Sequence, residues 1–156
     1  MKTNIGISDK SRKEVAGILS KILADEYVLY TKTRNAHWNV SGPDFHAMHL
    51  FFESQYDQVD ESIDEIAERI KSLGHDAPGS LATMLKLTRL KETSGESASS
   101  QSLIKGLLAD HETIIRQLRD DAPKCAKLGD DGTNDFLVGL MEEHEKMAWM
   151  LRASLR

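Results

Sequence analysis

The chain has 156 residues, 40% of them hydrophobic and 29% charged, which suits one folded domain over residues 1–156 with a short tail at residues 1–8. The net charge of −5 argues against a surface that binds nucleic acid on all sides. No apolar run reaches the length of a membrane span or a signal peptide, so we expect a cytoplasmic or nucleoid-associated protein. A single cysteine, Cys125, forms no intrachain disulfide and is not interpreted as a nucleophile.

The first half of the chain is predicted to form two long helices. Ser8 or Asp9 can cap the first, whose apolar periodicity runs into the mid-thirties and leads to His37. Pro43 can open the second, because its missing N–H would be unpaired there, and the next helix stop is Gly74. The second helix is therefore expected to be about 30 residues long.

The second half is predicted to hold one short helix and two long ones. A helical turn follows residues 78–80, and a long helix spans about 100–121 and ends before Pro123. The last helix runs from about Thr133 nearly to the end of the chain. Four long helices with one long crossover predict an all-α, ferritin-like four-helix bundle with a short extra helix in the crossover.

The second helix carries a stripe of metal-ligand side chains beside its apolar stripe. The members of this stripe are His49, Glu53, Asp60, Asp64 and Glu68. It is either an ordinary solvated acidic face or half of a metal site. One ion cannot reach both His49 and Asp64 of one helix, because they lie about 22 Å apart and ligand bonds are about 2.0–2.6 Å long.

A second copy of the chain could complete such a site. An antiparallel two-fold contact about the middle of the helix brings His49 of one chain opposite Asp64 and Glu68 of the other. An intrachain di-iron site of the ferritin-like kind requires Glu-x-x-His on two helices, and no histidine here has Glu three residues before it. The intersubunit site is therefore the favoured interpretation.

Several segments resemble the Dps family, the mini-ferritins first known as DNA-binding proteins of starved cells. They are HWNV at His37, the eleven residues between His37 and His49, FFESQYDQVDESIDEIAERI, and EKMAWMLRASL at the end. The resemblance covers nearly the whole chain. It implies a dodecamer, a hollow shell that oxidises Fe(II) at dimer interfaces, prefers hydrogen peroxide to oxygen, stores ferric mineral and protects against oxidative stress.

The resemblance also implies a two-iron ferroxidase site made by five side chains. His37 and His49 would serve one side, and Asp64 and Glu68 would come from the two-fold-related subunit. Glu53, one turn after His49, would contact or bridge iron where many relatives have Asp. Such mixed imidazole and carboxylate ligands suit Fe(II), and they also accept zinc or manganese.

Each of several other polar and aromatic residues has two possible interpretations. His46 is an outer ligand or proton relay, or an ordinary polar residue at the helix start. Trp38 is a core or interface aromatic, or a quencher of stray oxidising equivalents. Asp131 and Asp135 simply favour the start of the last helix, or, by resemblance, line pores that admit Fe(II). The remaining histidines are predicted to lie on the surface: His75, His111 and His144.

DNA binding is expected to be weak or absent near neutral pH. Phosphate binding needs several exposed cations, and we expect no basic extension after the last helix. The cations near the N-terminus are Lys2, Lys10, Arg12 and Lys13. Twelve copies at −5 would sum to a net charge of about −60, which opposes DNA binding.

The alternatives to an iron-oxidising shell are a DNA-compacting protein and a non-catalytic helical module. The helical module gives no reason for the register of histidines and acids.

Overall fold

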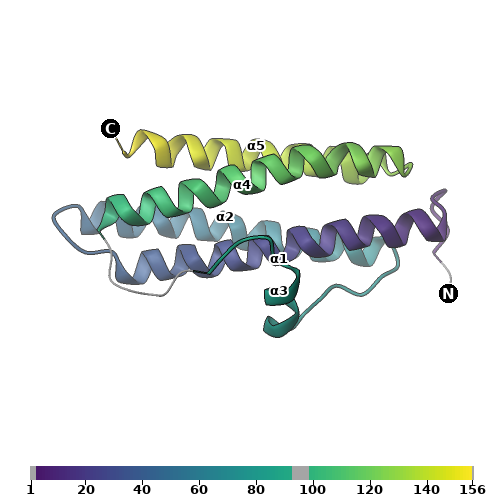
Figure 1. Ribbon diagram of the computed structural model, residues 1–156, viewed down its shortest axis with the longest axis horizontal. Helices are drawn as coiled ribbons and strands as arrows, with labels where there is room; N and C mark the ends of the chain where they lie inside the picture. The colour runs from purple at the N-terminus through teal and green to yellow at the C-terminus, as the bar shows by residue number, and fades with distance from the viewer. Residues whose placement is uncertain (1–2, 93–98, 156) are drawn as a thin grey trace.

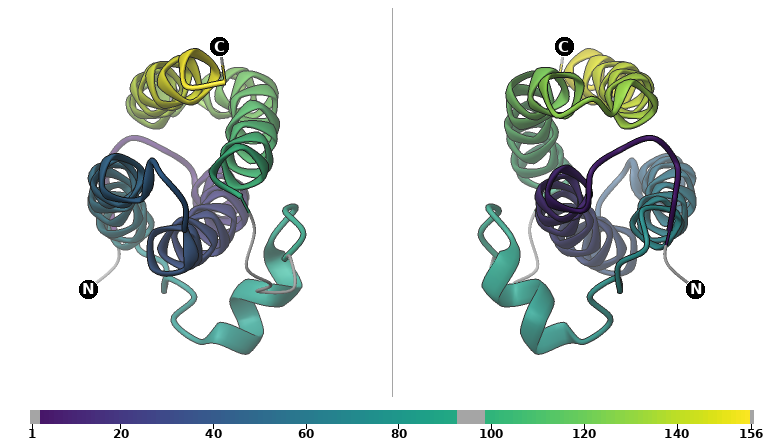
Figure 2. Two further views of the ribbon diagram at one scale, coloured as in Figure 1. Left: turned by 90° about the vertical axis from the view of Figure 1, so that its left-hand side faces the viewer. Right: turned by 90° about the vertical axis from the view of Figure 1, so that its right-hand side faces the viewer.

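The computed structural model describes residues 3–92 and 99–155, and its named elements in these ranges are all helices. They are α1 (Asp9–Asn39), α2 (Phe45–Ser72), α3 (Leu81–Leu87), α4 (Ser100–Lys127) and α5 (Asp131–Ala153). The four long helices run side by side, and the segment that holds α3 lies outside them against α1 (Figures 1 and 2). The predicted all-α bundle with a short helix in its crossover is confirmed. No described helix is both long and apolar enough to cross a membrane.

The first two helices begin and end close to the predicted positions. The Ser8 side chain accepts a hydrogen bond from the Ser11 N–H and so caps α1. The helix continues to Asn39, which places His37 inside its last turn. α2 begins at Phe45 and ends just before Gly74, whose φ of +84° is a left-handed conformation that glycine adopts without strain.

The predicted end of the third long helix is wrong, because α4 continues through Pro123 to Lys127. Proline removes one backbone hydrogen bond but does not by itself overcome tertiary packing. Here Ala122 and Cys125, on either side of Pro123, are buried in the core, while Pro123 itself faces outward. Packing therefore holds the last turns of α4 in place.

The start of α5 depends on Asp130, which caps the helix. Its carboxylate accepts hydrogen bonds from the Thr133 N–H at 2.9 Å and from Arg69 Nη2 of α2 at 2.7 Å. Asp130 is only 1% exposed. This cap starts the helix at Asp131, two residues before the predicted start at Thr133.

The core lies between two helix pairs. α1 packs mainly on α2, and α4 packs mainly on α5, with less extensive packing between the pairs, as the end-on views show (Figure 2). The space between them is filled by apolar side chains from all four long helices. Among the largest fully buried ones are Leu19, Ile22, Phe52, Ile66, Ile114, Leu118 and Leu137.

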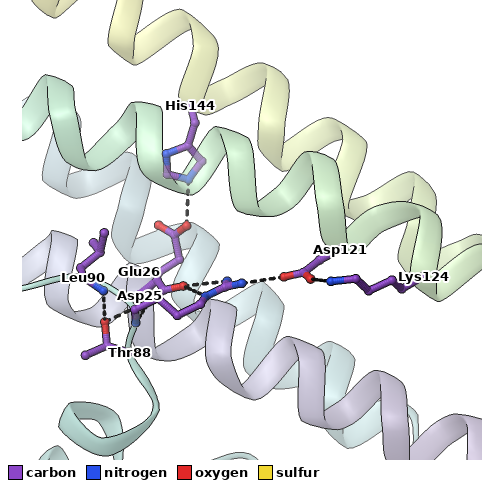
Figure 3. Close-up of polar contacts among 8 residues, drawn as sticks. Asp25, Glu26, Thr88, Leu90, Asp121, Lys124 and His144 are labelled. Carbon is purple, nitrogen blue, oxygen red and sulfur yellow. Dashed lines mark hydrogen bonds and ion pairs between the residues drawn. The ribbon is translucent and has the colours of Figure 1, made fainter.

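Polar contacts attach the crossover to the bundle. Arg89 Nε donates to Asp25 of α1 at 2.8 Å, and its Nη1 donates to Asp121 of α4 at 2.8 Å. The Thr88 hydroxyl also donates to Asp25. Figure 3 labels Asp25, Thr88 and Asp121 of this network, together with Lys124, which pairs with Asp121. The chain leaving α3 is therefore held against both α1 and α4.

The segment before α1 is held by Arg12. Its guanidinium donates to the backbone oxygens of Thr3 and Ile7 at 3.0 and 3.1 Å and pairs with Asp9 at 2.8 Å. Arg12 is only 6% exposed. This cation is therefore engaged within the fold. Lys2 lies outside the described residues.

Candidate metal centre

The end of α1 and the start of α2 bring His37 and His49 together. Their rings are stacked, with centroids 3.7 Å apart. Each Nδ1 lies 2.8 Å from the backbone carbonyl oxygen of the other residue. A carbonyl oxygen only accepts, so each Nδ1 carries the proton and each Nε2 keeps its lone pair. Histidines that bind metals are commonly held in this way through their other nitrogen.

Glu53 lies one turn after His49 and is connected to the histidine pair through Tyr56. The Tyr56 hydroxyl donates to Glu53 Oε1 at 3.4 Å, and its ring meets the His37 ring edge-on, with centroids 5.2 Å apart. Burial raises the pKa of Tyr56, and the nearby Glu53 and Asp57 raise it further. The phenol therefore stays protonated and remains the donor to the carboxylate.

Arg34 packs an aromatic cluster behind the histidines. Its guanidinium carbon lies 4.5 Å from the centroid of Tyr56, 5.1 Å from that of Trp38 and 5.6 Å from that of Tyr30. These distances allow cation–π attraction. Trp38 is nevertheless 63% exposed, so the interpretation of Trp38 as a core residue is wrong. Its interpretations as an interface residue and as a quencher of oxidising equivalents stay open.

Arg34 and Tyr56 were not predicted from the sequence to be site residues, although their spacing offered a signal. Arg34 lies three residues before His37, and Tyr56 lies three residues after Glu53. A spacing of three places side chains on the same side of a helix. Each residue is therefore the helical neighbour of a predicted ligand.

Asp64 and Glu68 lie farther along α2, away from the histidines. They follow His49 by 15 and 19 residues, which corresponds to about 22 and 28 Å. Both are exposed, and their side chains make no hydrogen bond or ion pair with other described residues. One chain thus brings His37 and His49 together, with Glu53 one turn farther along α2, while the two distal acids lie apart from them.

Within one chain, the described residues contain no group of three or more His, Cys, Asp or Glu side chains placed to hold a metal ion. The two histidines with Glu53 would offer only part of a ligand set. The shared site with a second subunit therefore stays a prediction.

Two of the predicted surface histidines are buried, and that prediction is wrong. His111 of α4 and His144 of α5 are both 0% exposed, and their Nδ1 atoms lie 2.9 Å apart. The reason is their place among apolar neighbours at helical spacing, as in Leu107, His111 and Ile114. His75 is half-buried, and His46 is exposed.

Three further residues are placed as follows. Asp131 and Asp135 are exposed in the first turns of α5. Cys125 is buried, and burial, assisted by the charges of Asp130 and Asp121, raises its pKa to about 11. This thiol is protonated near neutral pH, in agreement with the interpretation that it is not a nucleophile.

Comparisons with known proteins agree with this architecture. The family model described as a ferritin-like domain matches residues 16–156. A low temperature-induced protein of Nostoc sp. is 45% identical over 151 residues, which cover 96% of this chain and 84% of the relative. The DNA protection during starvation protein 2 of Bacillus anthracis is 37% identical and covers 92% of this chain and 97% of its own.

Solved structures agree as well. The Dps protein of Vibrio cholerae, described as a member of a broad superfamily of ferritin-like diiron-carboxylate proteins, superposes with a TM-score of 0.93 at 34% identity. The match covers 100% of this chain and 98% of the Vibrio chain. The chain belongs to the Dps family of ferritin-like proteins.

Proposed function

We propose that this chain is the subunit of an iron-oxidising and iron-storing shell, with ferroxidase sites shared between two-fold-related subunits. One observation carries the proposal. The reciprocal bonds of His37 and His49 to each other's carbonyl oxygens engage both Nδ1 atoms and leave Nε2 of each stacked ring available to bind a metal. Family membership and the diiron-carboxylate description of the Vibrio relative support iron as the metal.

The chemistry follows from the ligand types. His37, His49 and Glu53 of one subunit, with Asp64 and Glu68 of its mate, would bind two Fe(II) ions as substrate. Each iron gives up one electron, and one hydrogen peroxide takes up both electrons and two protons to form two waters. Carboxylates stabilise the Fe(III) product because they are hard, anionic ligands. Two-electron reduction of peroxide releases no hydroxyl radical, which supports peroxide as the preferred oxidant and a role in oxidative stress.

The ferric product would collect as mineral inside a dodecamer of this chain. We propose that Asp131 and Asp135 line the entry path, because both are exposed at one end of the bundle and carry charge that attracts Fe(II). Asp130 is excluded from this role, since its carboxylate is buried on Arg69 and on the α5 cap.

The test uses metal-free protein, Fe(II) added without oxygen, and then limiting hydrogen peroxide. We expect rapid formation of Fe(III) at about one peroxide per two irons. The double variant Asp64→Ala, Glu68→Ala should be about 10- to 100-fold slower, because it removes ligands from the shared site. Light scattering on each variant checks that its assembly is unchanged.

The matched control is Glu61→Ala, Glu65→Ala, which removes two exposed acids from the same helix. It should oxidise iron at the wild-type rate. Wild-type protein that behaves like buffer, or two double variants that slow equally, would contradict the proposed site. In the same assay, Asp135→Asn should slow iron uptake into the shell, and unchanged uptake would remove the proposed entry path.

DNA compaction is the second candidate, favoured by the names of the starvation-protection relatives. Two observations oppose it here. The chain carries a net charge of −5, and Arg12, one of the few cations near the N-terminus, is buried and engaged within the fold.

A further inference from the structure

Three titratable side chains, joined by hydrogen bonds, form a row across the core of the bundle. His144 Nε2 lies 2.8 Å from Glu26 Oε1, and His144 Nδ1 lies 2.9 Å from His111 Nδ1. All three residues are 0% exposed. They come from α1, α4 and α5, so this row of hydrogen bonds connects the two helix pairs. Figure 3 shows the bond between Glu26 and His144. Glu26 precedes His37 by 11 residues, or about 16 Å along α1.

The three side chains Glu26, His144 and His111 have two protonation states that fit their hydrogen bonds, and these states differ by one proton. With Glu26 ionised and both imidazoles neutral, His144 donates to Glu26 and accepts from His111, and the net charge is −1. One more proton brings the net charge to zero and lies either on Glu26 or on His144. On His144 it makes both ring nitrogens donors and turns His111 Nδ1 into an acceptor. Burial, and then the proximity of His144, hold the pKa of His111 well below its usual 6.5, so His111 is neutral in both states.

The charge of the surroundings distinguishes the two states. Charged groups on α1 and α4, together with Arg89 of the crossover, are already paired with each other. They form the network of Asp25, Arg89, Asp121 and Lys124 and the pair of Lys32 and Asp110. Each of these groups has equal numbers of positive and negative charges. Among the described residues, Glu26 forms no ion pair with a lysine or an arginine, and its Oε2 has no hydrogen-bond partner.

A fully buried carboxylate with one hydrogen bond and no counter-ion is unfavourable. A proton on His144 turns that carboxylate into half of an ion pair, and an imidazole is a stronger base than a carboxylate. We propose that Glu26, His144 and His111 bind one proton as a unit, with the proton on His144 between the other two side chains. This site is separate from the proposed iron chemistry and does not depend on it.

A proton fits this geometry better than a metal ion. Both nitrogens of His144 are already engaged in hydrogen bonds. The unpaired atoms that remain are Oε2 of Glu26 and Nε2 of His111, at opposite ends of this row. They do not converge on one point, in agreement with the absence of a three-ligand metal group among the described residues.

The position of the proton gives it a structural role. The Glu26–His144 bond joins α1 of one helix pair to α5 of the other, where packing is less extensive than within the pairs. Loss of the proton would leave an unbalanced negative charge where the two helix pairs meet. We therefore expect the bound proton to hold the two helix pairs together.

The experiment is ¹⁵N NMR of the assembled protein labelled at its histidine rings, at pH 7.5. Ordinary histidines are mainly neutral at this pH and carry one protonated nitrogen. We expect one of the six histidines to carry two protonated nitrogens, and His144→Gln assigns that signal to His144. His111 should carry its single proton on Nε2.

Glu26→Gln retains the shape and the hydrogen bond but removes the charge, and it should convert His144 to a neutral ring. The matched control is Asp110→Asn, which neutralises a carboxylate next to His111 that faces Lys32 instead. This control should leave His144 doubly protonated. A neutral His144 in the wild-type protein, or a doubly protonated His144 that persists in Glu26→Gln, overturns the proposal. A wild-type spectrum in which no histidine is doubly protonated overturns the proposal even if a variant does not fold.

Discussion

At the candidate metal centre, backbone carbonyls rather than side chains determine the tautomers of the two histidines. His37 and His49 each donate from Nδ1 to the other's carbonyl oxygen, so the α1–α2 connection itself prepares both rings. The neighbouring carboxylate has a different partner. Glu53 accepts from the protonated Tyr56, which also contacts the His37 ring. Tyr56 therefore connects two of the predicted ligands without being one.

Replacing Tyr56 with Phe tests this positioning role. The change removes the donor to Glu53 and leaves the ring, so we expect Fe(II) oxidation to slow severalfold, as for other groups that orient metal ligands. Stability should fall by no more than about 1 kcal/mol, because one long hydrogen bond is lost. Stopped-flow oxidation measures the rate. Tyr27→Phe is the control, since the Tyr27 hydroxyl has no hydrogen bond with the described residues, and equal rates in the two variants would contradict the role.

The buried His111 predicts how stability depends on pH. Its pKa is depressed by burial and by His144, so the folded protein keeps it neutral while the unfolded chain takes up a proton near pH 6.5. The contribution of His111 is therefore complete above pH 6.5 and is lost as pH falls below that value. The slope reaches at most about 1.4 kcal/mol per pH unit.

Urea unfolding at pH 7.5, 6.5 and 5.5 measures this dependence. The variant His111→Gln should lose part of the slope between pH 6.5 and 5.5. The variant His75→Gln alters a half-buried histidine outside the core and should keep it. A wild-type protein whose stability stays constant across this range would be inconsistent with the depressed pKa.

At the scale of elements, the long crossover is held by one cation between two acids of different helices. Arg89 bridges Asp25 of α1 and Asp121 of α4, whose side chains are 1% and 8% exposed. Asp25 also accepts from the Thr88 hydroxyl and the Arg89 N–H. The crossover is thus attached by buried, charge-assisted bonds, which are stronger than exposed pairs.

Removal of Arg89 should therefore be costly. Arg89→Ala leaves two nearly buried carboxylates without their partner, and we expect a loss of about 3 kcal/mol. For a chain of this size, that corresponds to a fall in Tm on the order of 10 °C. Arg119→Ala is the comparison, because Arg119 forms an exposed pair with Glu145 and should cost under about 1 kcal/mol. Similar melting temperatures for the two variants would refute the bridging role.

At the scale of the whole molecule, the net charge favours the proposed role in iron oxidation over DNA compaction. Each chain has a net charge of −5, and assembly into the proposed shell would multiply this charge. The acids would attract Fe(II) and repel phosphate. Because Arg12 is bound to the backbone of Thr3 and Ile7, the exposed cations near the N-terminus are fewer than the sequence indicated.

We therefore expect little or no DNA retardation in a gel-shift experiment at neutral pH. The measurement is made at low salt, where phosphate contacts are strongest, with micromolar protein. A known basic DNA-binding protein serves as the positive control. Strong retardation that weakens as salt is raised would contradict this expectation and favour DNA compaction.

Much of the architecture followed from local rules in the sequence. Helical spacing of apolar residues, the Ser8 cap and Gly74 located the first two helices to within a few residues. Those signals depend on neighbours along the chain, so sequence alone carries them. Pro123 is the exception, because a local rule predicted a helix end where buried neighbours continue the helix.

Some features of the candidate site likewise followed from the sequence, and others from the tertiary structure. The sequence by itself determined the ligand types and their register on α2, and distance along that helix separated the histidine from the distal acids. Only the tertiary structure decided the tautomers of His37 and His49, the contact of Tyr56 with Glu53, and the burial of Glu26, His111 and His144. Each of these depends on residues from different helices, and such contacts are created by packing rather than by the order of residues along one helix.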